Sequence, residues 1–349
     1  MGFGKKHGTV YQTVRLTTLI LQAANRHQKT GAVFLDIAKA FDRIWHEGLV
    51  LKMLHNKLPV YQASLTKSFL TDREFQVTVD GTTSTTRPMT AGVPQGSCLS
   101  PLLFNIYMAD IPKSRHTNLL AYADDTAITA SAKIHKHIAT KLQAHLTTLA
   151  TWMDKWRLQV NPAKTQVVLF NNGRKQPPRD VLHWKGSRLQ WSKTAKYLEV
   201  MYDSNLNWRA HIQKTRRNAQ IQLHTLYPLI GRNSRLNIKN KLNIYKLYIR
   251  PIITYAAPAW ATVSPTNLRD LQSMENRILR TILQAPWFIR NTTLRRDSEL
   301  MPLTEFMKNL AITHFGKSEV ATNPAITESH VQANPEDRLK YPKDSIMQQ

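Results

Sequence analysis

The chain carries Asn-Leu-Leu-Ala-Tyr-Ala-Asp-Asp at positions 118–125, an apolar run that ends in two adjacent carboxylates. Gly-Ala-Val-Phe-Leu-Asp at positions 31–36 has the same form and ends in a single carboxylate. Short apolar runs of this kind are typical of buried strands. An isolated charge is costly to desolvate there unless a partner neutralises it. We therefore expect Asp36, Asp124 and Asp125 to form a compact oxygen-rich site for hard divalent cations, although Asp36 alone fits a helix N-cap equally well.

A glycine-containing turn, Ala-Gly-Val-Pro-Gln-Gly-Ser, lies between these two runs at positions 91–97. Its glycines would let the backbone lie close against a nucleotide. We expect Gly96 to provide such an approach and Gln95 to present its amide to the nucleotide or template. The alternative for Gln95 is a loop amide whose hydrogen bonds are satisfied by the protein.

Two further residues have candidate roles beside the carboxylates. Phe41 lies five residues after Asp36. There it would lie under the sugar of a nucleotide bound at the carboxylates and exclude a 2′-hydroxyl on that sugar. Plain core packing explains Phe41 equally well. Lys164, in Asn-Pro-Ala-Lys-Thr at 161–165, would donate a proton or charge to a leaving pyrophosphate, provided that it comes within hydrogen-bond reach. A solvated turn lysine is the alternative for Lys164.

The charge balance predicts a polyanionic partner. Among 349 residues, 48 Lys and Arg against 23 Asp and Glu give a formal net charge of +25, while 42% hydrophobic residues argue against wholesale disorder. Residues 204–269 contain 11 basic residues and no acidic residue, which suits a surface that lies along phosphates. The expected nucleic-acid contacts in this stretch are Lys214, Arg216, Arg217, Arg232 and Arg235.

The one cysteine, Cys98, excludes an intramolecular disulfide and a cysteine-cluster zinc site, and no disulfide-linked partner is expected. No signal peptide or membrane-spanning run is recognisable, so we expect a nuclear or cytoplasmic protein that is not secreted and binds no membrane.

The order of apolar patterns predicts an α+β fold. Helices are expected at 9–26, 38–54, 97–108 and 132–156, and mainly helix from 210 onward. Strands are expected at 31–37, 158–170, 189–191 and 196–202, with a turn at Asn161-Pro162 inside the second of them, and hairpins at 75–81 and 119–129. This β-α-(α)-β-β-α-β order matches the ferredoxin-like motif, with helices on one face of the sheet. The expected domains are 1–203, a basic helical domain at 204–321 and a tail at 322–349.

These motifs together resemble the reverse transcriptases of non-LTR (LINE-type) retrotransposons, closest to the jockey-like elements of arthropods. The resemblance runs through Gly2–Gln12, Phe34–His46, Ala91–Ser97, Tyr122–Asp125, Asn161–Thr165 and Lys196–Val200, and more weakly through Tyr245–Tyr255 and Tyr341–Asp344. It implies a right-hand polymerase with fingers, palm and thumb. It also implies RNA-directed DNA synthesis from dNTPs on an RNA template and a DNA primer, with Mg²⁺ or Mn²⁺. The same resemblance assigns catalytic or nucleotide-binding roles to Asp36, Phe41, Gln95, Asp124, Asp125 and Lys164.

The chain also departs from that family's pattern. Gly4 and Gly8 stand where the family usually has Arg and Ser, and Glu199 replaces a usual Gly. An upstream fingers segment and an endonuclease are not in the sequence, so we expect an N-terminally truncated enzyme of reduced or no activity. One alternative is a catalytically dead nucleic-acid-binding remnant or a domesticated host protein. Another is an RNA-templated RNA polymerase, which shares the carboxylates but would not favour a bulky Phe41.

Overall fold

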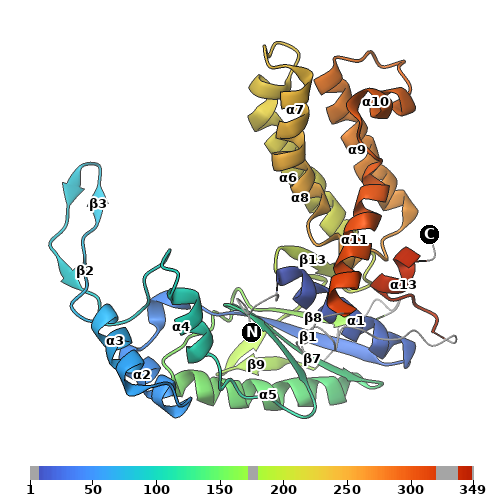
Figure 1. The fold of residues 1–349 in the computed structure, drawn as a ribbon. Helices are drawn as coiled ribbons and strands as arrows, with labels where there is room; N and C mark the ends of the chain where they lie inside the picture. Colours follow the sequence, from blue (N-terminus) through green and yellow to red (C-terminus); the bar gives the residue numbers. More distant parts are fainter. Residues whose placement is uncertain (1–7, 172–179, 320–336, 348–349) are drawn as a thin grey trace. The chain divides into compact units, whose positions relative to one another are not determined.

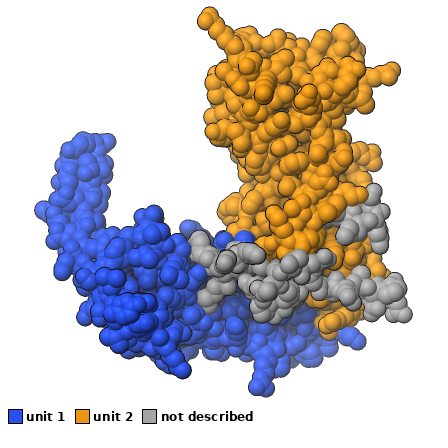
Figure 2. All heavy atoms as spheres, viewed as in Figure 1, with its two compact units in different colours: residues 1–8, 30–169, 176–192 blue, residues 9–29, 170–175, 193–349 orange. Residues whose placement is uncertain are grey.

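The computed structural model describes residues 8–171, 180–319 and 337–347, which divide into two compact units (Figure 2). In the described part of the chain, the first unit takes residues 8, 30–169 and 180–192. The second unit takes residues 9–29, 170–171, 193–319 and 337–347. The backbone therefore passes between the units several times.

The first unit is built on a five-stranded sheet with the order β11-β8-β1-β7-β6 (Figure 1). The strands are β1 (Lys29–Asp36), β6 (Asn118–Tyr122), β7 (Asp125–Ala132), β8 (Gln166–Phe170) and β11 (Trp191–Ser192). β6 and β7 form an antiparallel hairpin, and β11 adds to β8 in parallel. Helices lie between β1 and β6 and between β7 and β8, and the order β8-β1-β7-β6 is that of the ferredoxin-like motif. The predicted α+β fold is confirmed.

Helices and short hairpins complete this unit. The helices are α2 (His46–His55), α3 (Val60–Leu70), α4 (Ser100–Tyr107) and α5 (His135–Lys155), with a 3₁₀ turn η1 (Phe41–Arg43). The short strands pair as β2 (Glu74–Phe75) with β5 (Arg87–Pro88), β3 (Thr78–Val79) with β4 (Thr82–Thr83), and β9 (Leu182–Trp184) with β10 (Ser187–Leu189). α5 buries Ile138 and Leu142 close to β1, where a Cβ on Gly31 would lie 2.5 Å from Ile138 Cγ2. Glycine at position 31 therefore permits this close approach of helix and strand.

A buried lysine connects three helices of the first unit. Lys52, on α2, is 3% exposed and lies 3.7 Å from the ring centroid of Trp156, and it donates hydrogen bonds to Tyr107 O and to Asp110 Oδ1. Burial lowers the pKa of Lys52 to about 8, although Asp110 opposes this shift.

Two predicted elements differ from the structure. The helix expected over 38–54 begins only at His46, because Trp45 is extended and forms a bridge with Ala91. The strand expected over 158–170 begins at Gln166, because residues 162–164 form a turn in which Thr165 N–H bonds to Asn161 O at 3.0 Å.

The second unit is mainly helical, as predicted for residues after 210. Its elements are α1 (Thr9–Asn25), β12 (Thr194–Tyr197), β13 (Val200–Asp203), α6 (Arg209–Ile230), α7 (Ile238–Ile244), a π-helical segment η2 (Tyr245–Ile249), α8 (Arg250–Thr254), η3 (Ala257–Trp260), α9 (Pro265–Leu283), α10 (Asn291–Ser298), α11 (Leu303–Glu319) and α13 (Pro342–Met347). The Asp203 carboxylate accepts backbone N–H groups from Asn205, Asn207 and Trp208 at 2.8–3.1 Å, which fixes the entry into α6.

The observed division places more of the chain in the second unit than the expected boundary at 203/204. The hairpin β12–β13 and helix α1 both belong to it, and Tyr202 Oη donates to Thr13 O at 2.9 Å. Much of the expected tail lies outside the described residues, but Pro342–Met347 within it form α13.

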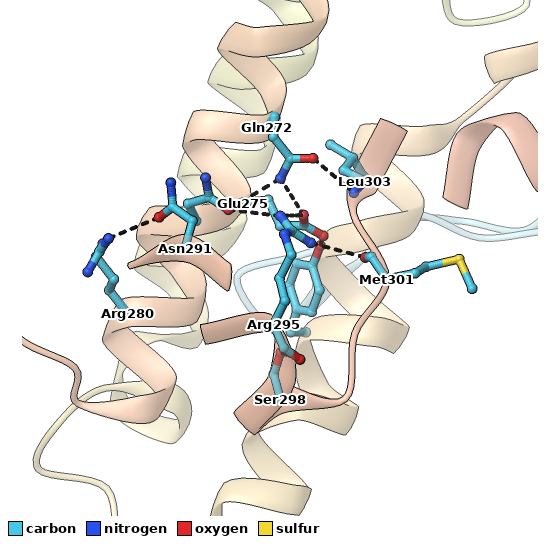
Figure 3. Close-up of polar contacts among 10 residues, drawn as sticks. Gln272, Glu275, Arg280, Asn291, Arg295, Ser298, Met301 and Leu303 are labelled. Carbon is cyan, nitrogen blue, oxygen red and sulfur yellow. Dashed lines mark hydrogen bonds and ion pairs between the residues drawn. The ribbon is translucent and has the colours of Figure 1, made fainter. Parts of the chain in front are cut away.

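A buried polar cluster joins η2, α9 and α10 (Figure 3). Glu275 is 1% exposed and accepts hydrogen bonds from Tyr245 Oη at 2.6 Å and from Arg295 Nη2 at 2.8 Å. Gln272 Nε2 donates to the same carboxylate at 2.8 Å. Because the buried charge is paired and hydrogen-bonded, the cluster fixes the arrangement of these segments.

In the part of the chain that the structure describes, none of the helices has the length and apolar character needed to span a membrane.

Candidate active site and nucleic-acid interface

The three candidate carboxylates lie at one edge of the sheet in the first unit. β1 and β7 are neighbours, and Thr30 Oγ1 lies 2.8 Å from Ser131 Oγ. Contact between the start of β1 and the end of β7 means that the two strands run antiparallel. Asp36 lies six residues after Thr30 and Asp125 six residues before Ser131, so the ladder brings both carboxylates to the same edge and the same face.

Asp124 occupies the turn that joins β6 to β7. Tyr122 and Asp125 are paired across the hairpin, so Ala123 and Asp124 form a two-residue loop, with Ala123 at a φ of +52°. Asp124 and Asp125 are exposed, and Asp36 is half-buried. The predicted hairpin around the aspartate pair is confirmed.

The donor set is compatible with hard cations, but it is not drawn together. Among residues 8–171, 180–319 and 337–347, no three His, Cys, Asp or Glu side chains converge as a metal-holding group. A compact site formed by Asp36, Asp124 and Asp125 therefore stays a prediction. The available ligands are carboxylate oxygens, which are the ligands that Mg²⁺ and Mn²⁺ prefer.

The turn that carries Lys164 is hydrogen-bonded to the end of β1. Asn161 N–H donates to Asp36 O at 2.8 Å, and Thr165 Oγ1 accepts from Asp36 N–H at 3.5 Å. The Thr165 hydroxyl also donates to Asn161 O at 2.9 Å. The structure thus brings Lys164, whose side chain is exposed, onto a loop bonded directly to a candidate metal ligand.

Phe41 combines a packed surface with an exposed one. Its ring stacks on Phe104 of α4, with centroids 4.7 Å apart and planes 23° apart. Phe41 is only half-buried, so part of the ring remains accessible. Core packing is therefore observed, and selection of the sugar stays a prediction.

Gln95 forms the hydrogen bond expected of a satisfied loop amide. Its Nε2 donates to Asp42 Oδ1 at 2.9 Å, a partner that the sequence did not indicate. Gly92, at a φ of +91°, lies against the backbone of Asp42, where a Cβ would come within 2.9 Å of Asp42 O. His46 Nε2 lies 2.7 Å from Gly92 O, and Gly96 has a φ of +86°. The 91–97 loop is therefore fastened to the η1 turn that carries Phe41.

Three of the five predicted nucleic-acid contacts are exposed, namely Arg217, Arg232 and Arg235. The other two have acidic partners from outside the acid-free stretch. Lys214 Nζ lies 2.9 Å from Glu199 Oε2, and Arg216 Nη1 lies 3.4 Å from Asp270 Oδ2. The expectation that the basic residues of 204–269 have no acidic counter-charge was therefore wrong for Lys214 and Arg216. Their acidic partners lie on other elements, outside that stretch of sequence.

Glu199 lies in the two-residue turn of the β12–β13 hairpin. Leu198 and Glu199 have φ values of +45° and +64°. The Glu199 carboxylate accepts from Lys196 Nζ at 2.8 Å and from Lys214, and these hydrogen bonds lower the pKa of Glu199 to about 2. The residue that replaces the family's usual glycine therefore adopts a left-handed backbone conformation.

Comparison with solved structures finds a telomerase from Candida albicans in complex with a fragment of telomeric RNA. The identity is 10% and the TM-score 0.38, over 84% of this chain and 57% of that one.

Curated relatives are more similar in sequence. A probable RNA-directed DNA polymerase from transposon BS of Drosophila melanogaster is 36% identical over 87% of this chain and 34% of its own length. The RNA-directed DNA polymerase from mobile element jockey of Drosophila funebris is 32% identical over 89% of this chain and 34% of its own length. The chain spans about a third of the length of these relatives, and the predicted resemblance to jockey-like proteins is confirmed.

Residues 1–202, more than half of the chain, match the family described as reverse transcriptase (RNA-dependent DNA polymerase). The matched region includes the ferredoxin-like sheet, the Asp124–Asp125 hairpin and the 161–165 turn. The chain therefore belongs to the reverse transcriptase family.

Proposed function

We propose that this chain is an RNA-directed DNA polymerase of a jockey-like non-LTR retrotransposon, which adds dNTPs to the 3′ end of a DNA primer on an RNA template. One observation carries the proposal: Asp36, at the end of β1, shares a sheet edge with the hairpin that carries Asp124 and Asp125. Family membership supports the same reaction.

Nucleotide addition is an in-line phosphoryl transfer that requires positioning and charge stabilisation more than covalent chemistry. Asp36, Asp124 and Asp125 would hold two Mg²⁺ or Mn²⁺ ions. When bound, such ions stabilise the attacking and leaving oxygens. Each aspartate supplies carboxylate oxygens at the sheet edge, and the exposure of Asp124 and Asp125 leaves those two accessible to ions and substrate.

The neighbouring residues have distinct proposed roles. Lys164 would supply a proton or positive charge to the leaving pyrophosphate from the turn bonded to Asp36. The accessible part of the Phe41 ring would lie against the sugar of the dNTP. Gly96 would allow backbone to approach the nucleotide, while the bond between Gln95 and Asp42 would hold the loop in position.

The test is extension of a DNA primer on an RNA template with Mg²⁺ or Mn²⁺. Asp124→Asn should abolish extension because it removes a ligand charge. Primer extension by the parent chain should also stop when both ions are removed. Asp80→Asn is the matched control, since Asp80 also lies in an exposed hairpin turn of the first unit and should tolerate the change. Undiminished extension by Asp124→Asn would remove the proposed site.

A nucleic-acid-binding protein without polymerase activity is the second candidate. The exposed Arg217, Arg232 and Arg235 favour it, because their charges do not depend on the carboxylate site. A parent chain that binds RNA–DNA duplex but extends no primer with either ion would establish this candidate and overturn the first.

A further inference from the structure

The connection between α9 and α10 displays two aromatic side chains to solvent. Trp287 is 86% exposed and Phe288 is 65% exposed, and their rings meet edge to face with centroids 6.0 Å apart. They are the central residues of a turn in which Ile289 N–H donates to Pro286 O at 3.2 Å. Adjacent aromatic residues this exposed mark a binding surface more often than scattered single apolar residues do.

A single guanidinium holds this turn in place. Arg280, near the end of α9, donates to Pro286 O at 2.8 Å, to Ile289 O at 2.7 Å and to Asn291 Oδ1 at 2.9 Å, and Figure 3 shows the last of these bonds. Both carbonyls that flank Trp287 and Phe288 are therefore fixed. The two rings are presented by an ordered turn, so little conformational entropy of this turn is lost when a ligand binds them.

α10 is fastened to α9 by a second arginine. Arg295 Nη2 donates to Glu275 Oε2 and to Asn276 Oδ1, each at 2.8 Å, and Arg295 Nη1 donates to Met301 O at 3.1 Å (Figure 3). The turn thus connects two helices that are themselves bonded together, which makes the aromatic pair a rigid feature of the second unit.

The charge around the turn is positive. Residues 276–296 contain five arginines and no acidic residue, and of these Arg277, Arg290 and Arg296 are exposed. Arg296 is paired with Asp297, with Nε 3.2 Å from Oδ1. Gln284 Nε2, at the end of α9, donates to Arg232 O at 3.3 Å. This bond places the start of the turn beside the α6–α7 loop, which carries the exposed Arg232 and Arg235.

We propose that Trp287 and Phe288 stack on unpaired bases of single-stranded RNA, with Arg232 and Arg290 contacting its phosphates. Aromatic faces beside a positive surface are the features that bind single strands, whereas stacking between neighbouring base pairs in a duplex covers the faces of the bases. Trp, Phe and Arg are also enriched at protein interfaces, so a protein-docking surface is one of the outcomes that the test distinguishes. The choice of RNA rests on the proposed function, in which the template is RNA.

The test measures the affinity of the parent chain and its variants for a fluorescently labelled, unstructured RNA oligonucleotide by anisotropy, without dNTPs. Trp287→Ala and Phe288→Ala should each weaken RNA binding by about tenfold, the range found for one base–aromatic stack. Trp287→Phe combined with Phe288→Tyr should retain most of the affinity, because both π faces remain. Tyr61→Ala is the control, since Tyr61 is 68% exposed but lies in the first unit.

The midpoint of thermal unfolding should not change in the alanine variants, because neither ring is buried. Unchanged RNA affinity in the double alanine variant would overturn the proposal. So would a loss of affinity for RNA–DNA duplex equal to that for single-stranded RNA, or a larger loss of affinity for single-stranded DNA. A change in sedimentation that shows loss of self-association would instead identify a protein-docking surface and also overturn it. Asp124→Asn should keep the RNA affinity, so failure of the polymerase proposal is distinguishable from failure of this one.

Discussion

Glu199 shows how a single residue can oppose the conformation of its own turn. Two-residue hairpin turns with two positive φ angles favour Asn and Gly, yet this turn has Leu198 and Glu199. Left-handed backbone costs a non-glycine residue roughly 1–2 kcal/mol. The exposed ion pairs with Lys196 and Lys214 recover little of this cost, because solvent screens them.

We therefore expect Glu199→Gly to raise the free energy of unfolding by about 1 kcal/mol, measured by urea denaturation. Glu199→Gln is the control, because it removes the charge without relieving the backbone and should not stabilise the protein. A destabilised glycine variant would mean that the ion pairs outweigh the strain.

The pH dependence of stability provides a separate prediction for Glu199. Its folded pKa of about 2 lies below the unfolded value of 4.5, so its stabilising contribution is present above pH 4.5 and is lost as pH falls toward 2. The thermal midpoint of the parent chain should therefore fall more steeply across this window than that of Glu199→Gln. Parallel curves for the two proteins would contradict the assignment.

Phe41 provides a test of sugar selection against core packing. Phe41→Val should lower the ratio of dNTP to rNTP incorporation, because a smaller side chain leaves room for a 2′-hydroxyl. Loss of the stack on Phe104 should also cost about 1–2 kcal/mol of stability. Phe41→Tyr, which keeps the ring, should preserve the ratio, and a constant ratio in the valine variant would leave packing as the only role.

At the scale of elements, some basic residues of the second unit form ion pairs with acidic side chains, and others are exposed. Replacing Arg217, Arg232 and Arg235 by Gln should flatten the dependence of log K on log salt for RNA–DNA duplex by about three units, roughly one per phosphate contact. Replacing Lys214 and Arg216 should have a smaller effect, because their charges are already partly neutralised. Equal effects per residue in the two variants would show that these ion pairs do not matter for binding.

The elements that the sequence predicted well are those whose pattern is local. Helix α5 and the β6–β7 hairpin follow directly from apolar periodicity and from the order of apolar and acidic residues. The turn at Asn161-Pro162 before β8 was also predicted locally, but its bond to Asp36 was not, and the break before α2 depends on the pairing of Trp45 with Ala91. Such partners are tens of residues away, so no local window contains them.

The candidate site followed the same rule. Its carboxylates could be named because each ends an apolar run, and strand order then brought them to one edge. The bond of Gln95 to Asp42 and that of Lys214 to Glu199 could not be anticipated, since both join different elements. Positions of acidic residues were thus predictable, but their pairing was not.

For the whole molecule, the division into units predicts which elements lose stability when α1 is disrupted. Leu16, on α1, is fully buried and belongs to the second unit. Leu16→Asp should destabilise that unit by about 4 kcal/mol or more, because it buries an unpaired charge. Amide hydrogen exchange should show lost protection in α6 and α9, while β1 and β7 keep theirs.

Leu65→Asp is the matched control, because Leu65 lies on α3 of the first unit and is 70% exposed. It should leave exchange in both units close to that of the parent chain. Loss of protection confined to the first unit in Leu16→Asp would show that α1 belongs with the sheet instead.

The reciprocal hydrogen bonds between Asn25 and Leu339 have a consequence for how the protein is made. Asn25 Nδ2 donates to Leu339 O, and Leu339 N–H donates to Asn25 Oδ1, each at 3.0 Å across 314 positions of sequence. At ribosomal elongation rates of 5–20 residues per second, the second partner emerges roughly 15–60 s after the first. During that interval α1 can pack on η3 but lacks its contact with α13, so a nascent chain stalled before residue 339 should bind chaperones more than the complete chain does.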